Sequence, residues 1–253
     1  MAPTKTIIVT GASRGIGLAA ARYLLTHKHN IVAVARTREP LQKLQSDFPG
    51  QVAIIAGDLG DLSLDLGQEV VDIAIGTYGQ LNGLIVNHGV LNPVKRISEA
   101  DAKEWSGAFE INVFSAIAMI KSALPSLRKT KGNIVLVSSG AAVGAYATWG
   151  AYGASKAVLN HIAMTLAVEE PDVTTTSIRP GVVDTDMQRE LREVHHTAMD
   201  KKDAEKFATL KSGGKLLKPE QPGHVLAKLA IDTPRELSGR FINWNDDALA
   251  TVQ

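Results

Sequence analysis

Thr10-Gly11-Ala12-Ser13-Arg14-Gly15-Ile16-Gly17 is the stretch that decides the fold, because it joins an apolar run at 7–10 to a helical pattern at 16–27. A glycine turn in that place bends tightly, lets the backbone approach a pyrophosphate and points a helix N-terminus at negative charge. Its Gly-x-x-x-Gly-x-Gly spacing differs from the plain Gly-x-Gly-x-x-Gly fingerprint, and by itself it also fits a simple strand–helix turn. Its position between the first strand and the first helix favours a dinucleotide site.

Short β-branched or apolar runs alternate with longer helical patterns along the whole chain. The expected strands lie at 7–10, 31–35, 52–56, 84–86, 134–138, 174–178 and 240–244. The expected helices lie at 16–27, 40–48, 64–78, 100–127 and 153–169. Near-continuous apolar strands are covered on both faces, and strands separated by helices form parallel sheets. The pattern predicts an α/β fold: one Rossmann-type, doubly wound domain over 1–253 with a mostly or wholly parallel seven-stranded sheet.

The composition excludes several classes of function. With 27 basic and 26 acidic side chains the formal charge is +1, so no global field attracts nucleic acid or an anionic membrane. The chain has no cysteine, which excludes disulfides, thiolate catalysis and cysteine-based metal sites, and we expect no metal. No run approaches about 18 uninterrupted apolar residues, and the segment before the first strand is too short for a signal peptide. We therefore expect a cytoplasmic protein.

The end of the second strand, Val34-Ala35-Arg36-Thr37-Arg38, discriminates between the two nicotinamide cofactors. An acid at this point binds a ribose 2′-hydroxyl, whereas an arginine accepts a 2′-phosphate. This segment has no acid and two arginines, and Arg14 in the glycine turn adds a third positive group. Arg36 is also compatible with an ordinary surface position. The missing acid nevertheless favours the phosphorylated cofactor, NADPH/NADP+.

Tyr152 and Lys156 stand four residues apart at the start of a long helical pattern, so they share one helix face. A free phenol has a pKa of about 10, and a nearby ammonium lowers it. The pair is therefore suited to general acid/base chemistry if a cleft receives it. A Tyr-x-x-x-Lys pattern considered alone is more often a surface helix pair.

The pair does not stand alone, because other motifs follow in a fixed order. With the glycine turn and Tyr152-x-x-x-Lys156, the chain resembles the short-chain dehydrogenase/reductase family through Asp58-Leu59, Asn87-His88-Gly89, Asn112, Ser139 and Pro180-Gly181. Ser139 precedes Tyr152 by 13 residues and Asn112 precedes it by 40, as in the family pattern. These motifs span nearly the whole chain, and their joint occurrence is highly specific.

The resemblance implies a role for each matching residue. Tyr152 would give a proton to a carbonyl oxygen, and Lys156 would depress the phenol pKa and hold the nicotinamide ribose. Ser139 would orient the carbonyl and stabilise developing negative charge. Asn112 would hold a water that links Lys156 to solvent.

The resemblance also implies the cofactor contacts. Asp58 and Leu59 would line the adenine, Asn87 the adjacent ribose, and Val183 and Thr185 the carboxamide. The full expected set of cofactor-binding residues is Gly11, Ser13, Arg14, Gly15, Ile16, Gly17, Arg36, Thr37, Asp58, Leu59, Asn87, Gly89, Lys121, Tyr152, Lys156, Pro180, Gly181, Val183 and Thr185.

One departure and one finer likeness qualify the resemblance. His88 stands where the family usually has alanine; a lone histidine is more often structural, and we assign it no chemistry. Val34-Ala-Arg-Thr37, Val137-Ser-Ser-Gly-Ala141, Asn160-His161, Glu169-Glu170-Pro171 and Pro180-Gly-Val-Val-Asp-Thr-Asp-Met187 are similar to fungal benzil reductases of the sepiapterin reductase-like group. That likeness implies NADPH-dependent reduction of one carbonyl of a vicinal diketone to a hydroxyketone.

The substrate end, the direction of the reaction and the oligomeric state have alternatives. The charged segment at 184–219 is either a substrate lid or a solvated helical face, and His195 and His196 within it are expected to be solvated. The same residues also serve an NADP-dependent secondary-alcohol dehydrogenase, and the same fold serves a catalytically silent NADP-binding sensor or scaffold. In relatives the two long helices form a dimer contact, so we expect a homodimer or homotetramer.

Overall fold

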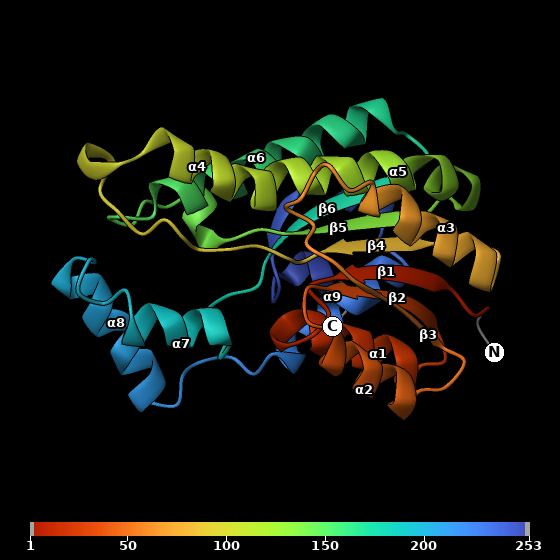
Figure 1. The fold of residues 1–253 in the computed structure, drawn as a ribbon, viewed down its shortest axis with the longest axis horizontal. Coiled ribbons are helices and arrows are strands. Elements are labelled where there is room, and N and C mark those ends of the chain that lie inside the picture. The colour runs from red at the N-terminus through yellow and green to blue at the C-terminus, as the bar shows by residue number, and fades with distance from the viewer. Residues whose placement is uncertain (1–2, 251–253) are drawn as a thin grey trace.

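Seven strands form one sheet in which every strand runs parallel to its neighbours (Figure 1). The order is β3-β2-β1-β4-β5-β6-β7, so the chain reverses its direction of winding between β1 and β4. The computed structural model describes residues 3–250, and the ends of the expected 1–253 domain lie outside the described residues. The strands are β1 Thr6–Thr10, β2 Asn30–Ala35, β3 Val52–Ala56, β4 Gly83–Val86, β5 Asn133–Val137, β6 Thr174–Arg179 and β7 Phe241–Asn243. The expected α/β fold with a wholly parallel seven-stranded sheet is confirmed.

Helices cover both faces of this sheet (Figure 1). One face carries α1 Gly15–Thr26, α2 Arg38–Asp47 and α9 Glu220–Ile231; the other carries α3 Leu66–Tyr78, α5 Ser115–Thr130 and α6 Gly150–Glu169. Short 3-10 turns occur at Ile97–Glu99, Gly140–Ala142, Arg235–Leu237 and Asp247–Leu249. Because both faces are covered, β1, β4 and β5 are buried along their whole length, which explains their largely apolar sequences, whereas the edge strands β3 and β7 are only partly buried.

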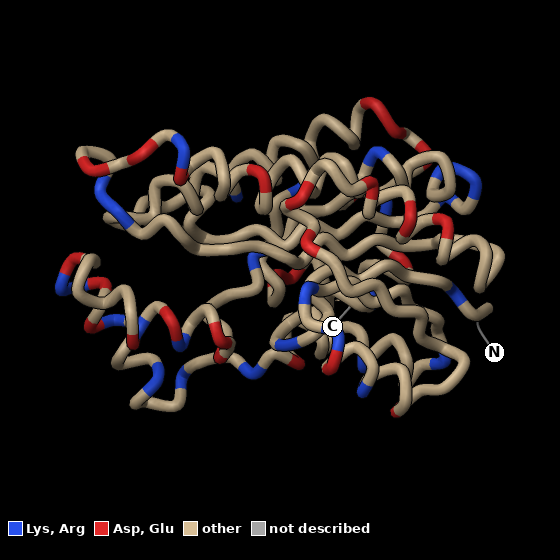
Figure 2. The backbone as a smooth tube through the Cα atoms, viewed as in Figure 1, with Lys and Arg blue, Asp and Glu red and all other residues tan. Residues whose placement is uncertain are grey.

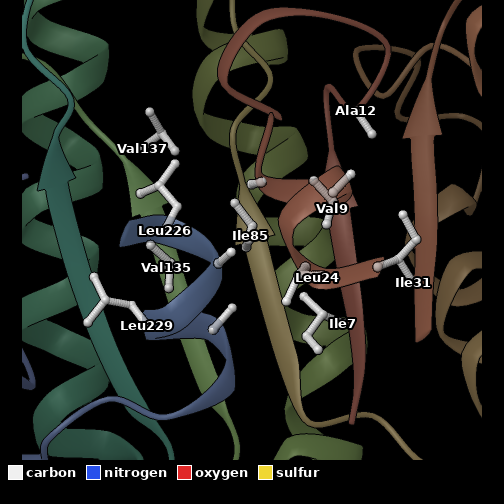
Figure 3. Close-up of a cluster of buried hydrophobic side chains, with 14 of the residues drawn as sticks. Ile7, Val9, Ala12, Leu24, Ile31, Ile85, Val135, Val137, Leu226 and Leu229 are labelled. Carbon is white, nitrogen blue, oxygen red and sulfur yellow. The ribbon is translucent and has the colours of Figure 1, made fainter. Parts of the chain in front are cut away.

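The core on the α1/α9 face shows how alternate strand residues serve opposite layers (Figure 3). Ile7 and Val9 of β1 point towards Leu24 of α1 and, with Ile85 and Leu226, form one fully buried cluster. The intervening β1 residue belongs to the cluster on the α3/α5/α6 face. This period of two fixes the register of β1 between β2 and β4.

One long helical stretch contains a local change of winding. The helix expected at 100–127 is present as α4 Ala102–Phe109, a π-helical segment Glu110–Phe114 and α5. Residues 102–130 are long and apolar enough to cross a membrane by length and composition, and 44% of the most apolar window is buried inside the protein. Met119, Ile120 and Leu127 of α5 pack on the sheet, as expected of a core helix.

The segment after β6 leaves the sheet and forms two further helices. These are α7 Asp186–Glu193 and α8 Lys201–Ser212, which project beyond the carboxyl ends of the strands (Figure 1). Acidic and basic residues alternate along both helices, as Figure 2 shows. Leu191, Met199 and Phe207 are nevertheless buried against residues of the main domain. The segment therefore has a solvated outer face and an apolar inner face.

Gly83 at the start of β4 tests how closely α9 packs on the sheet. A Cβ at Gly83 would overlap the backbone carbonyl oxygen of Ala230 in α9. We expect Gly83→Ala to lower the free energy of unfolding by about 1–3 kcal/mol, measured by urea unfolding. Gly76→Ala is the matched control, because Gly76 lies exposed in α3 with nothing within 4 Å of its Cβ position. That change should stabilise by up to about 1 kcal/mol. Equal effects of the two changes would contradict the close packing.

Candidate active site

The glycine turn adopts a backbone that only glycine takes without strain. Gly11 has φ +65° and Gly15 has φ +54°, both in the left-handed region. A Cβ at Gly17 would overlap the Gly11 carbonyl oxygen and lie 2.5 Å from Asn87 Nδ2. The first turn of α1 begins at Gly15 and carries no acid, so its free N–H groups and helix dipole face the cavity uncompensated. This arrangement fits an anionic group such as a pyrophosphate.

Hydrogen bonds join the ends of β1 and β4 where the winding of the sheet reverses. Asn87 Nδ2 donates to the carbonyl oxygens of Thr10 and Gly11 at 3.1 and 3.2 Å. The Asn87 backbone N–H donates to Thr10 Oγ1 at 2.9 Å. The crevice at such a reversal point is where doubly wound sheets bind ligands.

A cavity of about 320 Å³ opens at this crevice and contains most of the predicted site. The predicted residues that line it are Gly11, Ser13, Arg14, Gly15, Ile16, Arg36, Asp58, Leu59, Asn87, Gly89, Ser139, Tyr152, Lys156, Pro180, Gly181, Val183 and Thr185. The glycine turn and the Tyr152/Lys156 pair, which are far apart in the sequence, therefore share one cavity.

Four predicted residues of the described chain do not line the cavity. Gly17 lies behind the turn, and Asn112 is buried next to Gly89. Thr37 is exposed at the start of α2. Lys121 is exposed on α5, off the helix face that packs on the sheet, so the structure does not bring it to the site. Its expected approach to the cofactor stays a prediction.

Tyr152 and Lys156 lie in the first turns of α6, which begins at Gly150, three residues earlier than expected. Burial raises the pKa of Tyr152, and a hydrogen bond with Ser139 opposes that rise. Lys156 Nζ donates to the Val137 carbonyl at 2.9 Å and lies 5.8 Å from the centre of the Tyr152 ring. Burial lowers the pKa of Lys156 to about 8. Lys156 is not among the groups that shift the pKa of Tyr152 in this structure, so its expected lowering of the phenol pKa stays a prediction.

Asn112 is fixed within the π-helical segment by hydrogen bonds to the loop after β4. Its Oδ1 accepts from the Val90 N–H at 2.8 Å, and its Nδ2 donates to the Val90 carbonyl at 2.9 Å and to Ser155 Oγ at 3.0 Å. A Cβ at Gly89 would be 3.1 Å from Asn112 Oδ1 and 3.4 Å from Lys156 Nζ. Asn112 and Lys156 therefore flank Gly89 closely. A π-turn is a frequent feature of functional sites.

The far end of the cavity has an aromatic wall, which we define as Tyr146, Trp149 and Phe207. The rings of Trp149 and Phe207 stack with centroids 5.6 Å apart, and Tyr146 lies 4.8 Å from Trp149. Trp149 meets Tyr152 edge-on at 5.9 Å. None of these three residues was predicted from the sequence. The spacing of Tyr146, Trp149 and Tyr152 by three residues was a usable signal, whereas Phe207 comes from α8 and had none.

Two arginines differ in their partners. Arg14 Nη1 donates to Asp186 of α7 at 2.8 Å, so it bridges the glycine turn and the segment after β6. Arg36 lines the cavity, and within residues 3–250 no ion pair is present for it. Arg14 is partly neutralised by this pair but stays largely exposed, and its expected contribution of a third positive group beside the cofactor stays a prediction.

The histidines differ in burial. His88 lines the cavity with both ring nitrogens hydrogen-bonded, and burial lowers its pKa to about 4. His196 is exposed, as expected for a solvated residue. The side chain of His195 is only 14% exposed and contacts Glu190 at 3.2 Å, so it is less solvated than expected.

Comparison with known proteins agrees with this site. Residues 5–196 match the family model described as short chain dehydrogenase. A benzil reductase ((S)-benzoin forming) of Saccharomyces cerevisiae is 40% identical over 98% of this chain and 99% of its own length. The crystal structure of a short-chain dehydrogenase/reductase of the same yeast superposes with a TM-score of 0.95 at 39% identity, covering 98% of this chain and 99% of the yeast chain.

A more distant solved structure carries a nucleotide. It is a short chain dehydrogenase from Shigella flexneri complexed with NADP, with a TM-score of 0.79 at 25% identity over 96% of this chain and 97% of that chain. The family model covers most of this chain, and the yeast relatives match nearly all of it. The chain therefore belongs to the short-chain dehydrogenase/reductase family of oxidoreductases.

Proposed function

We propose that this oxidoreductase is an NADPH-dependent carbonyl reductase that reduces one carbonyl of a vicinal diketone to a hydroxyketone. The observation that carries the proposal is the shared cavity, with the glycine turn at one end and Tyr152, Ser139 and Lys156 at the other. A site of this kind places a dinucleotide and a proton donor beside the same reacting carbon.

The residues of the first half of the cavity fit a dinucleotide. Left-handed Gly11 and Gly15 and the uncompensated start of α1 suit a pyrophosphate. Arg36 and the absence of an acid from 34–38 support NADPH, and so does the relative complexed with NADP. When bound, this cofactor supplies the hydride that reduces a carbonyl carbon.

The residues of the second half would manage the proton. Because burial raises the pKa of Tyr152, the phenol is protonated at neutral pH and can give its proton to the carbonyl oxygen as the carbon accepts the hydride. The resulting phenolate takes a proton back from solvent, which balances the reaction. Ser139 would hold the carbonyl oxygen, and Lys156 would stabilise the phenolate while it is charged.

Asn112, which the family resemblance assigns to holding a water between Lys156 and solvent, has little hydrogen-bonding capacity left for that water. Both amide hydrogens are donated inside the protein, and Oδ1 already accepts from Val90. Only the second lone pair of Oδ1 is left for a water. We assign Asn112 chiefly to positioning the Gly89–Val90 backbone beside Lys156.

The aromatic wall supports an aryl-substituted substrate. Tyr146, Trp149 and Phe207 offer ring faces and edges next to Tyr152, where an aryl group attached to the reacting carbonyl would pack. The benzil reductase relative supports the same substrate class. We further propose that 184–219 is the substrate lid, because Leu191, Met199 and Phe207 of this segment pack in one cluster with Trp149 and Tyr152.

The same family residues also catalyse the reverse reaction, so a secondary-alcohol dehydrogenase is the alternative.

We propose a homodimer or homotetramer assembled through α5 and α6. Phe114, Ile117, Met164 and Val168 support this assembly, because they are large apolar side chains exposed at or near these helices. Membership of an oxidoreductase family favours an enzyme over a silent NADP-binding sensor. The cytoplasmic location stays a prediction.

Tyr152→Phe tests the reaction. Removing the phenol proton should lower kcat for reduction of benzil or 1-phenylpropane-1,2-dione by a factor of about 10² or more. The cofactor dissociation constant should change little, because the cavity keeps its shape. Consumption of NADPH is followed by absorbance, and Tyr23→Phe, at the far end of α1, is the matched control. Failure of the wild-type protein to reduce any diketone would overturn the proposed function.

Arg36→Asp tests the cofactor preference. The new carboxylate should repel a 2′-phosphate and accept a 2′-hydroxyl, which lowers the ratio of kcat/KM with NADPH to kcat/KM with NADH by about tenfold to a hundredfold. Arg38→Asp makes the same charge change two residues further on, at a residue that does not line the cavity. An unchanged ratio in Arg36→Asp, or an equal change in both variants, would contradict the assignment.

Phe207→Ala tests the aromatic wall. Loss of the ring that stacks on Trp149 should raise KM for 1-phenylpropane-1,2-dione about tenfold and leave KM for butane-2,3-dione nearly unchanged. Phe207→Leu, which keeps apolar volume, should have an intermediate effect. A parallel rise of KM for both diketones would indicate a disturbed lid and would contradict aryl recognition by this ring.

A further inference from the structure

His88 lies beside the hydroxyl group that joins the ends of β1 and β4. Thr10 Oγ1 is fully buried and accepts from the Asn87 N–H, while His88 Nδ1 lies 2.8 Å from the same oxygen. Thr10 is the residue immediately before the glycine turn. The imidazole therefore contacts the base of the segment that would hold the cofactor.

The other ring nitrogen reaches the π-helical segment that carries Asn112. In this segment the Ser115 N–H bonds to the Glu110 carbonyl, five residues back, so the Ile111 carbonyl loses its usual N–H partner. Ser115 Oγ donates to that carbonyl at 2.6 Å, and His88 Nε2 lies 2.6 Å from Ser115 Oγ. His88 thus supports the hydroxyl that compensates for the π-turn.

A neutral imidazole satisfies both contacts at once. With its hydrogen on Nε2 the ring donates to Ser115 Oγ, whose own hydrogen goes to the Ile111 carbonyl. Nδ1 then accepts from Thr10 Oγ1, whose one hydrogen is shared between Nδ1 at 2.8 Å and the Ile85 carbonyl oxygen at 3.1 Å. Burial keeps the ring in this neutral state, since it lowers the pKa of His88 to about 4. Alanine, which the family usually has here, makes neither contact.

We propose that His88 is a positioning residue that couples the glycine turn to the π-helical segment carrying Asn112. This inference rests on the proposed function, in which the turn binds NADPH and Asn112 fixes the backbone beside Lys156. Ordering of the turn by the cofactor stiffens Thr10, and the imidazole transmits that order to Ser115 and the π-turn.

Three substitutions separate the two contacts. His88→Ala removes both of them. His88→Asn places an amide near the position of Nδ1 and keeps the contact to Thr10. His88→Gln places an amide near the position of Nε2 and keeps the contact to Ser115. The thermal unfolding midpoint of each variant shows whether the fold is retained.

Three quantities are measured for each variant. The first is the dissociation constant of NADPH, with that of NADH in parallel, and the second is kcat with 1-phenylpropane-1,2-dione at saturating cofactor. The third is amide hydrogen exchange at 110–115 with and without cofactor. In the wild-type protein we expect the cofactor to slow exchange at 110–115, and in His88→Ala this protection should be lost. His88→Ala should also weaken cofactor binding and lower kcat, each by about three- to tenfold. His88→Asn should restore binding but not kcat, and His88→Gln should restore kcat but not binding.

Two results would overturn the inference. Unchanged binding, kcat and protection in a folded His88→Ala would show that the imidazole couples nothing. Proportional losses of binding, kcat and thermal stability in all three variants would show a merely structural role. If the wild-type protein reduces no diketone, the proposed function fails, while cofactor binding and hydrogen exchange still decide the role of His88. If His88→Ala does not fold, the opposite behaviour of His88→Asn and His88→Gln decides it.

Discussion

The hydrogen-bonded junction between Thr10 at the end of β1 and Asn87 at the end of β4 is the constraint on which the site depends. The Asn87 amide holds the carbonyls of Thr10 and Gly11, and no side chain fits at Gly11 or Gly17 beside it. The crevice therefore opens at this junction, the glycine turn is held at its edge, and the loop from His88 to Val90 continues directly into the site.

Burial of Tyr152 and Lys156 in the crevice at this junction sets the protonation states of both side chains. Lys156 and Tyr152 are almost fully enclosed, and enclosure disfavours the charged form of each, so the lysine pKa falls to about 8 and the phenol pKa rises. A protonated phenol is the form that reduction of a carbonyl requires. The hydrogen bond from Ser139 works against the rise, and Ser139 is also the group expected to hold the substrate oxygen. The pKa of the proton donor is thus linked to the group that positions the substrate.

The sequence was sufficient for the strands and for most of the helices on the sheet, although α9 at Glu220–Ile231 was not predicted. The β-branched and apolar runs predicted the seven strands and a mostly or wholly parallel sheet, because strands separated by helices form parallel sheets. The motifs placed the glycine turn and Tyr152 in one cavity. It was insufficient where one side chain meets a distant partner: the Arg14–Asp186 ion pair and the stacking of Phe207 on Trp149 join residues remote in sequence. Lys121 lies exposed on α5, and its expected approach to the cofactor stays a prediction.

One of these long-range contacts, the stacking of Phe207 on Trp149, lies next to the proposed proton donor Tyr152. Trp149 immediately precedes α6 and lies three residues before Tyr152, so the ring on which Phe207 of α8 stacks also meets Tyr152 edge-on. Because Phe207, Trp149 and Tyr152 belong to one buried cluster, a movement of α8 that uncovers Trp149 would also expose Tyr152. Because burial is what raises the phenol pKa, the lid would act on the proton donor as well as on the substrate. The stacking of Phe207 on Trp149 would then affect both substrate binding and the pKa of the Tyr152 phenol.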